Sequence, residues 1–213
     1  GNPTSSLNTC LQDDTQASGG FVGALNTAGG AMTEYTADLT PYIGKTITLR
    51  YLLASTTSTL TDLGWYVDDI NVEMFLTVGE PELPAPPGST NAPGWTSGGT
   101  TSWAYGTTTA DPVGETGYDT NPAGSYGASE CGYIETPELP GPVVAADPTL
   151  TFDHWYEIES LFSTTTWDGG FVLASGDGGA TWSELTPDGG YPRAVTTTGA
   201  VDDCKATYGL PAG

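Results

Sequence analysis

The stretch DLTPYIGKTITLRYLLASTTSTLTDLGWYVDDINVEMF, residues Asp38 to Phe75, decides the fold of this chain. Its first part has an apolar residue at every second position from 47 to 53, which is the period of a half-buried β-strand. The residues of this apolar stripe are Ile47, Leu49, Tyr51 and Leu53. A second alternation begins at Trp65, so the stretch predicts two strands joined by a polar connection.

The second alternation changes phase at Asp68-Asp69. Trp65 and Val67 begin it, but Ile70 continues it in the opposite phase, as a single inserted residue would cause. A β-bulge inserts one residue into a strand and re-aims the side chains around it. Two adjacent carboxylates at such a point can turn towards a shared cation, and the alternative is that both end in solvent.

Composition favours an all-β protein. The 213 residues include 30 Gly and 16 Pro, and Thr, Gly, Pro and Ser separate the apolar runs without a convincing helical period. The segment 78–93, VGEPELPAPPGSTNAP, predicts a linker, because proline removes backbone donors and favours stiff, extended chain. We therefore expect three parts, namely residues 1–77, the linker 78–93 and residues 94–213.

The charge balance is strongly acidic. The 26 acidic residues outnumber four basic residues, which gives a formal net charge of −22. Such a surface repels nucleic acid and anionic membranes, and no apolar run approaches the roughly 20 residues of a membrane span. Bound divalent ions would relieve the repulsion between crowded carboxylates, so calcium is the expected cofactor, and solubility or a salty habitat is the alternative.

The calcium ligands that we expect come from the bulge and from later acids. Asp68 and Asp69 supply the bulge carboxylates, helped by Asp168 or by the loop acids Asp111 and Asp119. The loop acids match no fixed calcium-binding signature, so a solvated loop is the alternative there. Asp168 begins an Asp-Gly-Gly sequence that recurs at 177–179 and 188–190, and all three predict turns, because Asp-Gly turns need positive φ.

A further strand is predicted over residues 150–158. Its apolar face consists of Leu150, Phe152, His154, Tyr156 and Ile158. The only histidine therefore sits among apolar neighbours, which favours a hydrogen-bonded core residue over a catalytic one. The chain also lacks a zinc-ligand helix, a nucleophile elbow and a convincing acid–base pair, so we expect no enzymatic activity.

Four phrases resemble one family of domains. DLTPYIGKTITLRY and GWYVDDINV, and later LTFDHWYEIES and WDGGFVLASGDGGATWSEL, are similar to the MAM domain and to accessory domains of immune inhibitor A-type secreted metallopeptidases. The resemblance covers most of the chain and implies a jelly-roll, galactose-binding-like antiparallel β-sandwich in a secreted protein. Because these domains are mostly non-catalytic companions of other modules, the resemblance brings no activity with it.

The order of the two halves is inverted relative to that family. Residues 1–77 resemble the closing half of the domain, and residues 94–213 resemble its front half. Writing the tail before the head brings Cys204 and Cys10 into one short loop, so the resemblance implies a disulfide between them and leaves Cys131 without an assigned partner. An odd number of cysteines in a chain that looks secreted leaves one thiol unpaired or bonded to another chain.

Three explanations fit the inverted order. The chain is a circular permutant that closes on itself, a fragment cut across two tandem domains, or a subunit whose neighbour completes its sandwich. The third explanation removes exposed strand edges through a head-to-tail contact and makes a homopolymer. A start at Gly1 without Met or a signal-peptide pattern also predicts a processed or excised chain.

We therefore expect an extracellular structural or adhesive protein at the cell surface, the repeating subunit of a filament stabilised by calcium and by strands shared between subunits. The alternative is a carbohydrate-binding accessory module of a secreted hydrolase, with a polysaccharide as partner. Its sugar-stacking rings would be Trp95, Trp103, Trp155 and Trp167. A row of exposed indoles favours the sugar module, and buried indoles favour the scaffold.

Overall fold

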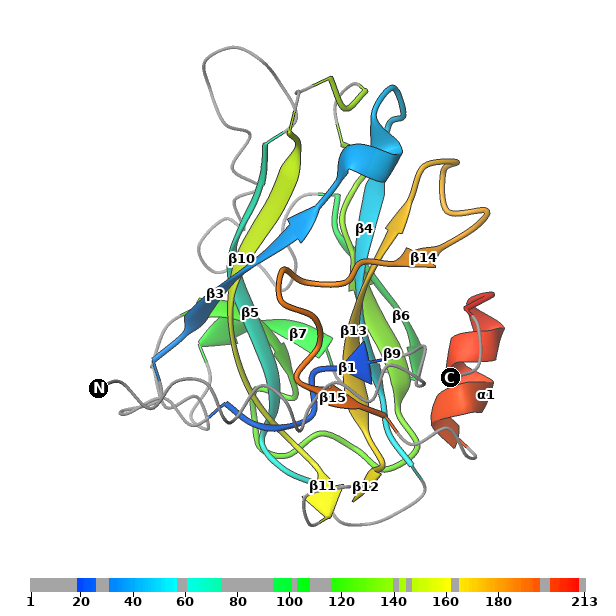
Figure 1. Ribbon diagram of the computed structural model, residues 1–213. Helices are drawn as coiled ribbons and strands as arrows, with labels where there is room; N and C mark the ends of the chain where they lie inside the picture. The colour runs from blue at the N-terminus through cyan, green and yellow to red at the C-terminus, as the bar shows by residue number, and fades with distance from the viewer. Residues whose placement is uncertain are drawn as a thin grey trace, which may run out of the picture.

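The computed structural model describes residues 19–25, 31–56, 61–73, 94–100, 103–107, 116–139, 142–144, 147–161, 165–195 and 200–210. These residues form two antiparallel β-sheets that pack face to face, so the predicted all-β sandwich is confirmed (Figure 1). No helix in this part of the chain has the length and apolar character needed to cross a membrane.

The first sheet, called here the β10 sheet, has the strand order β2-β10-β5-β8-β7, and β3 also pairs with β10. Its strands are β2 (Gly23–Ala24), β3 (Thr33–Asp38), β5 (Gly64–Glu73), β7 (Trp103–Thr107), β8 (Thr116–Thr120) and β10 (Thr149–Ile158).

The second sheet, called here the β4 sheet, has the order β14-β13-β4-β9-β6. Its strands are β4 (Thr48–Ala54), β6 (Thr96–Thr100), β9 (Cys131–Glu135), β13 (Gly169–Ser175) and β14 (Ser183–Glu184). Two short pairs join β1 (Gly19–Gly20) with β15 (Arg193–Ala194) and β11 (Ser160–Leu161) with β12 (Thr165–Thr166).

Two helical elements lie in the part of the chain that the structure describes. A 3-10 turn, η2 (Thr40–Tyr42), precedes β4, and the helix α1 (Ala200–Thr207) lies outside the β4 sheet (Figure 1). The sequence did not predict α1, because one short, weakly apolar helix gives no clear period.

Both halves of the chain contribute to both sheets. β4 lies between β13 and β9, and β5 lies between β10 and β8, so strands from residues 1–77 occupy central positions among strands from residues 94–213. The described strands of the two halves thus pair within a single chain. The linker 78–93 lies outside the described residues.

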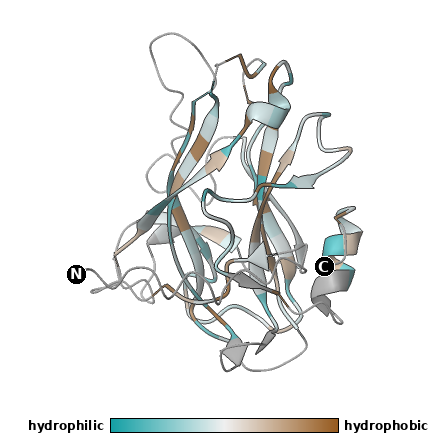
Figure 2. Cartoon of the chain, in the orientation of Figure 1, coloured by the Kyte–Doolittle hydropathy of each residue, from teal (hydrophilic) through white to brown (hydrophobic). Residues whose placement is uncertain are grey.

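The predicted apolar stripes face the core between the sheets. Leu49, Tyr51 and Leu53 of β4 are fully buried there, opposite the stripe of β10 from Leu150 to Ile158. Figure 2 shows the hydrophobic segments on the strands of both sheets. The opposite face of β4 is buried as well, because Leu52 and Ala54 pack in a second apolar cluster with Cys204 of α1 and with Trp182.

The predicted bulge at Asp68-Asp69 is confirmed. Asp153 of β10 lies opposite Asp68, but Thr151 lies opposite Asn71, so β5 carries one extra residue between these two pairs. Asp69 has a φ of 45°, the left-handed conformation that such an insertion can require. Ile70 therefore faces the core in spite of the phase change in the sequence.

Two of the three predicted Asp-Gly-Gly turns are confirmed and the first is wrong. Gly178 and Gly189 have φ values of 72° and 86°, as the turns require. Gly169 and Gly170 instead begin β13 without positive φ. A side chain at Gly170 would place its Cβ 2.7 Å from Cε3 of Trp65, so close approach of the indole is the reason for glycine there.

The segment Gly19–Leu25 joins the two sheets. Phe21 exchanges backbone hydrogen bonds of 2.9 and 3.0 Å with Gly170 of β13, while β2 pairs with the end of β10. The Phe21 ring is fully buried, with centroids 4.5 Å from His154, 5.0 Å from Tyr191 and 5.4 Å from Trp65. One aromatic side chain therefore anchors the head of the chain to both sheets.

The first prediction concerns this anchor. Phe21→Ala removes a fully buried ring and leaves a cavity between the sheets, so we expect the free energy of unfolding to fall by about 3–5 kcal/mol. Urea denaturation followed by tryptophan fluorescence measures the change. Val144→Ala, at a position that is 45% exposed, is the matched control and should change stability by less than about 0.5 kcal/mol. Equal effects of the two substitutions would contradict an anchoring role for Phe21.

Candidate functional site

The bulge places Asp68 in a row of acids on the outer face of the β10 sheet. Asp153 of β10 lies directly opposite Asp68 of β5 and directly opposite Glu34 of β3. Directly opposite residues of antiparallel strands project to the same side, and like charges in such pairs repel. A cation bound at this row would remove the repulsion.

The other predicted calcium ligands lie in different surroundings. Asp119 of β8 is in register with Tyr66, on the same face as Asp68, and is 1% exposed. Asp69 is exposed at the bulge, and Asp111 lies outside the described residues. Among the described residues, no three Asp, Glu, His or Cys side chains are grouped so that they could hold a metal ion. The structure thus places Asp68, Asp69 and Asp119 on neighbouring strands without forming a recognisable set of ligands.

Asp168 lies in a separate, buried hydrogen-bond network. Its carboxylate accepts the Thr56 N–H at 2.7 Å and the Tyr126 hydroxyl at 2.7 Å, and that hydroxyl accepts the Glu159 N–H at 2.9 Å. Burial raises the pKa of Asp168, although the hydrogen bonds from Thr56 and Tyr126 act in the opposite direction. Burial and repulsion by Asp168 and Asp62 raise the pKa of Glu159. These hydrogen bonds from Thr56 and Tyr126 to Asp168 therefore stabilise the segment that immediately precedes β13.

Three of the four tryptophans proposed as sugar-stacking rings are packed in the protein. Trp95, Trp103 and Trp155 are 5–7% exposed. Trp95 stacks on Tyr118 with centroids 4.6 Å apart, Trp103 donates its indole N–H to the Gly132 carbonyl, and Trp155 packs against Tyr66. The expectation that these three form an exposed platform is wrong, and Trp167 alone of the four keeps a partly exposed side chain.

The expected disulfide between Cys10 and Cys204 is also wrong. Cys204 of α1 is bonded to Cys131 at the start of β9, with the two Cα atoms 5.4 Å apart and a sequence separation of 73. The bond holds α1 against the β4 sheet. Cys10 lies outside the described residues, and the resemblance that suggested its pairing says nothing about an added helix.

His154 is a core residue, as the sequence predicted. It is fully buried between the sheets, and its Nδ1 accepts the indole N–H of Trp65 at 3.3 Å. Its Nε2 is buried without a hydrogen-bond partner in the structure. Burial lowers the pKa of His154 to about 3, because removal from water disfavours the charged imidazolium.

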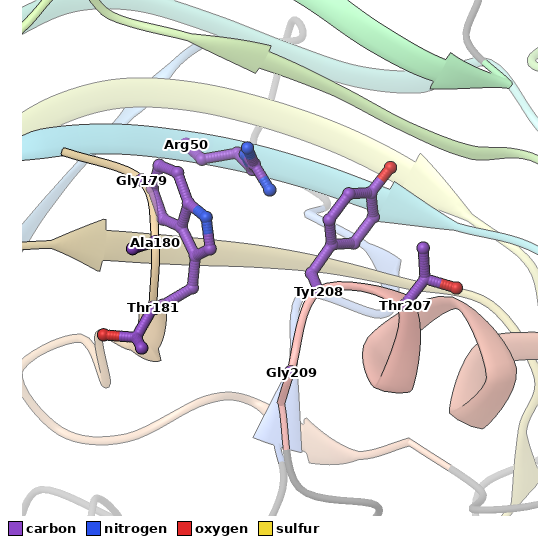
Figure 3. Close-up of a pocket in the computed structure, with 8 residues that line it drawn as sticks. Arg50, Gly179, Ala180, Thr181, Thr207, Tyr208 and Gly209 are labelled. Atoms are coloured by element: carbon purple, nitrogen blue, oxygen red, sulfur yellow. The ribbon is translucent and has the colours of Figure 1, made fainter. Parts of the chain in front are cut away.

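A pocket that the sequence did not predict lies on the outer face of the β4 sheet. It has a volume of about 300 Å³ and is lined by Arg50, by residues 179–182 of the β13–β14 connection and by residues 207–209 at the end of α1. Figure 3 shows the Arg50 guanidinium beside the space between that connection and Tyr208. This pocket is the candidate binding site of the described structure.

Arg50 is held by aromatic rings and by one carboxylate. Its guanidinium carbon lies 3.8 Å from the ring centre of Tyr133 and 3.9 Å from that of Trp182. Its Nε and Nη2 donate to one oxygen of Glu135 at 3.1 and 2.6 Å. The third nitrogen, Nη1, is buried and has no hydrogen-bond partner in the part of the chain that the structure describes.

The wall formed by α1 is fixed at two further points. Lys205 of α1 pairs with Glu184 of β14 at 3.1 Å, and the Tyr208 hydroxyl donates to the Cys131 carbonyl at 3.4 Å. Burial raises the pKa of Glu184, while the positive charge of Lys205 acts in the opposite direction. The only sequence signal for this site was a single arginine at an outward position of β4 in a chain with four basic residues.

Comparison with known proteins gives no match: no family model, no curated protein and no solved structure matches this chain. The resemblance to MAM and immune inhibitor A accessory domains therefore stays a prediction from the residues quoted above.

The second prediction concerns the pH dependence of stability. Because the pKa of folded His154 is about 3 and that of an unfolded histidine is about 6.5, the unfolded chain binds the extra proton first as the pH falls. This histidine then costs about 1.4 kcal/mol of stability per pH unit below 6.5.

Replacement with a side chain that does not titrate isolates this effect. From pH 7 to pH 5, urea denaturation should show a loss of stability about 2 kcal/mol larger for the wild-type protein than for His154→Gln. The acids titrate alike in both proteins and cancel in the comparison. An identical pH dependence would contradict a buried, neutral imidazole.

Proposed function

We propose that this protein is a non-catalytic structural or adhesive domain of an extracellular assembly, a jelly-roll sandwich that repeats in a calcium-stabilised filament. The observation that carries the proposal is the segment Gly19–Leu25, which joins the two sheets through one buried ring, Phe21. Its short strands make few ladder hydrogen bonds, so the same contacts can be made by the segment of a neighbouring subunit. In this assembly each head segment enters the core of the next molecule.

Three side chains capable of acid–base or nucleophilic chemistry support the scaffold instead. His154 accepts a hydrogen bond from Trp65 inside the core, and Asp168 binds Thr56 and Tyr126. Tyr51 is fully buried, and burial raises the pKa of its hydroxyl. These groups favour a structural role over a catalytic one.

An extracellular location is supported by the bond between Cys131 and Cys204. Disulfides persist in oxidising compartments and are rare in the reducing cytosol. The net charge of −22 keeps such a domain soluble and favours cations as its counterpart.

Calcium is proposed at the outer face of the β10 sheet. Support comes from the row of Glu34, Asp153 and Asp68, in which like charges face one another across three strands, and from Asp69 at the adjoining bulge. Carboxylate oxygens are the ligands that Ca²⁺ prefers. Bound calcium would stabilise the strands beside which the head segment docks, because β10 pairs with both β3 and β2.

The third prediction tests the assembly and its ion together. Electron microscopy of the protein in millimolar calcium should show filaments, and an excess of chelator should shorten them and lower the melting temperature. Asp69→Ala should reproduce the effect of the chelator. Asp203→Ala, which removes one exposed carboxylate from α1, should leave filaments and melting temperature unchanged.

A competing peptide adds a test of the shared segment. A peptide with the sequence of residues 17–27 should cap growing filaments, whereas the same peptide with serine in place of Phe21 should not. Particles that remain monomeric in calcium, with a melting curve that does not respond to the chelator, would overturn the proposal.

A further inference from the structure

We infer that the pocket over Arg50 binds a neutral saccharide. The inference rests on the adhesive part of the proposed function and gives it a recognition site. The sugar contact is then expected on the outer face of the β4 sheet. It is no longer expected at Trp95, Trp103 and Trp155, which are buried.

The pocket contains a side chain with a hydrogen-bond donor that lacks an acceptor. Arg50 lines the pocket and is 6% exposed, and its Nη1 is buried with no hydrogen-bond partner among the described residues. Arginine has only donors, so an acceptor must come from elsewhere, and a buried donor without an acceptor is destabilising. A hydroxyl or ring oxygen of a ligand can supply it.

The walls of the pocket combine an aromatic ring with polar side chains. The partly exposed ring of Tyr208 lines the pocket, whereas Trp182, which is 9% exposed, packs its ring on the Arg50 guanidinium. The hydroxyls of Thr181 and Thr207 donate to Asp177 and to the Asp203 carbonyl, and each oxygen can still accept a hydrogen bond from a ligand. Sugars combine apolar C–H faces with rings of hydroxyls, and sites that bind them pair aromatic rings with a few placed polar groups. A volume of about 300 Å³ is at the small end of ligand pockets, which suits one or two sugar units.

The charge balance around the pocket favours a neutral ligand over an anion. The charge of Arg50 is balanced by Glu135 at 2.6 Å, and Lys205 beside the pocket is balanced by Glu184. No net positive charge is left in these pairs to offset the −22 charge of the chain, which repels anions. Nη1 thus offers a hydrogen bond rather than an uncompensated charge.

The pocket is also pre-formed. The disulfide between Cys131 and Cys204 holds α1, and the Arg50 guanidinium lies between the rings of Tyr133 and Trp182. Gly209 has a φ of 71°, and a Cβ added to it would meet no other atom within 4 Å, so the rim stays open at the end of α1. Little conformational entropy is lost when a ligand enters such a site.

Nuclear magnetic resonance of the arginine side chains tests the inference directly. The sequence contains two arginines, Arg50 and Arg193, so two ¹⁵Nε signals are expected, and Arg193→Lys assigns them. The probes are the methyl glycosides of glucose, galactose and mannose, neutral hexasaccharides of the same sugars, glucuronate and sulfate. We expect at least one neutral glycoside to shift the Arg50 signal in a saturable manner and to leave that of Arg193 in place.

Two variants locate the site without replacing Arg50. Ala180→Phe fills the pocket from an exposed position and should abolish the shift, whereas Ala206→Phe, at an exposed position of α1 outside the pocket, should preserve it. Tyr208→Ala should weaken binding at least 10-fold. Melting curves establish that each variant is folded.

Four outcomes would overturn the inference. The first two are the absence of a shift with any probe and a shift with glucuronate or sulfate alone. The other two are binding that persists in Ala180→Phe and binding that is lost only in Trp167→Ala. Filament formation in calcium is scored in the same samples. Loss of sugar binding with intact filaments would count against this inference alone, and intact binding without filaments would count against the assembly alone.

Discussion

The burial of Phe21 between the sheets is the contact on which the rest of the structure depends. The ring packs against His154 and Trp65, which are themselves hydrogen-bonded across β10 and β5. The backbone of Phe21 pairs with Gly170 of β13 in the opposite sheet. Because Gly170 has no side chain, the Trp65 indole can approach β13 closely enough to complete this core. The His154 imidazole is buried in this core, and burial lowers its pKa and so favours the neutral form.

The two outer faces of the sandwich have opposite characters. Acids face one another across the β10 sheet, where Asp153 lies between Glu34 and Asp68. On the β4 sheet, Arg50 and Lys205 are buried, paired with acids and stacked against aromatic rings. Two of the four basic residues of the chain are thus used to fix α1 and the pocket beneath it. A cation and a ligand would therefore bind on opposite sides of the molecule, and the two activities can be tested separately.

Much of the fold could be predicted from local patterns. The apolar alternation placed β4, β5 and β10, and the phase change at Asp68-Asp69 located the bulge to the residue. These signals are local, because side chains alternate along a strand wherever one face is buried. The Asp-Gly-Gly sequence at Asp168 was wrongly predicted to form a turn. Glycine is required there by close packing on Trp65, and a sequence does not distinguish this requirement from that of a turn.

The candidate site could not be predicted in the same way. Arg50, Glu135, Trp182 and Tyr208 come from four separated segments, and the pairing of Cys131 with Cys204 spans 73 residues. No local period records such contacts, and disulfide connectivity does not follow from the positions of cysteines alone. The tryptophans were predicted to be sugar-stacking rings because the sequence alone does not distinguish a buried indole from an exposed one.

An engineered disulfide between the two halves of the chain tests the central claim most directly. Glu73 of β5 and Thr149 of β10 are directly opposite partners, at a spacing that a disulfide can bridge. The double variant Glu73→Cys and Thr149→Cys, oxidised in the folded state, should run on non-reducing electrophoresis as a monomer that migrates faster than its reduced form. A ladder of covalent multimers that the wild-type protein does not form, and that collapses on reduction, would show that β5 and β10 of one sandwich come from different chains. That result would contradict the pairing of β5 with β10 within a single chain.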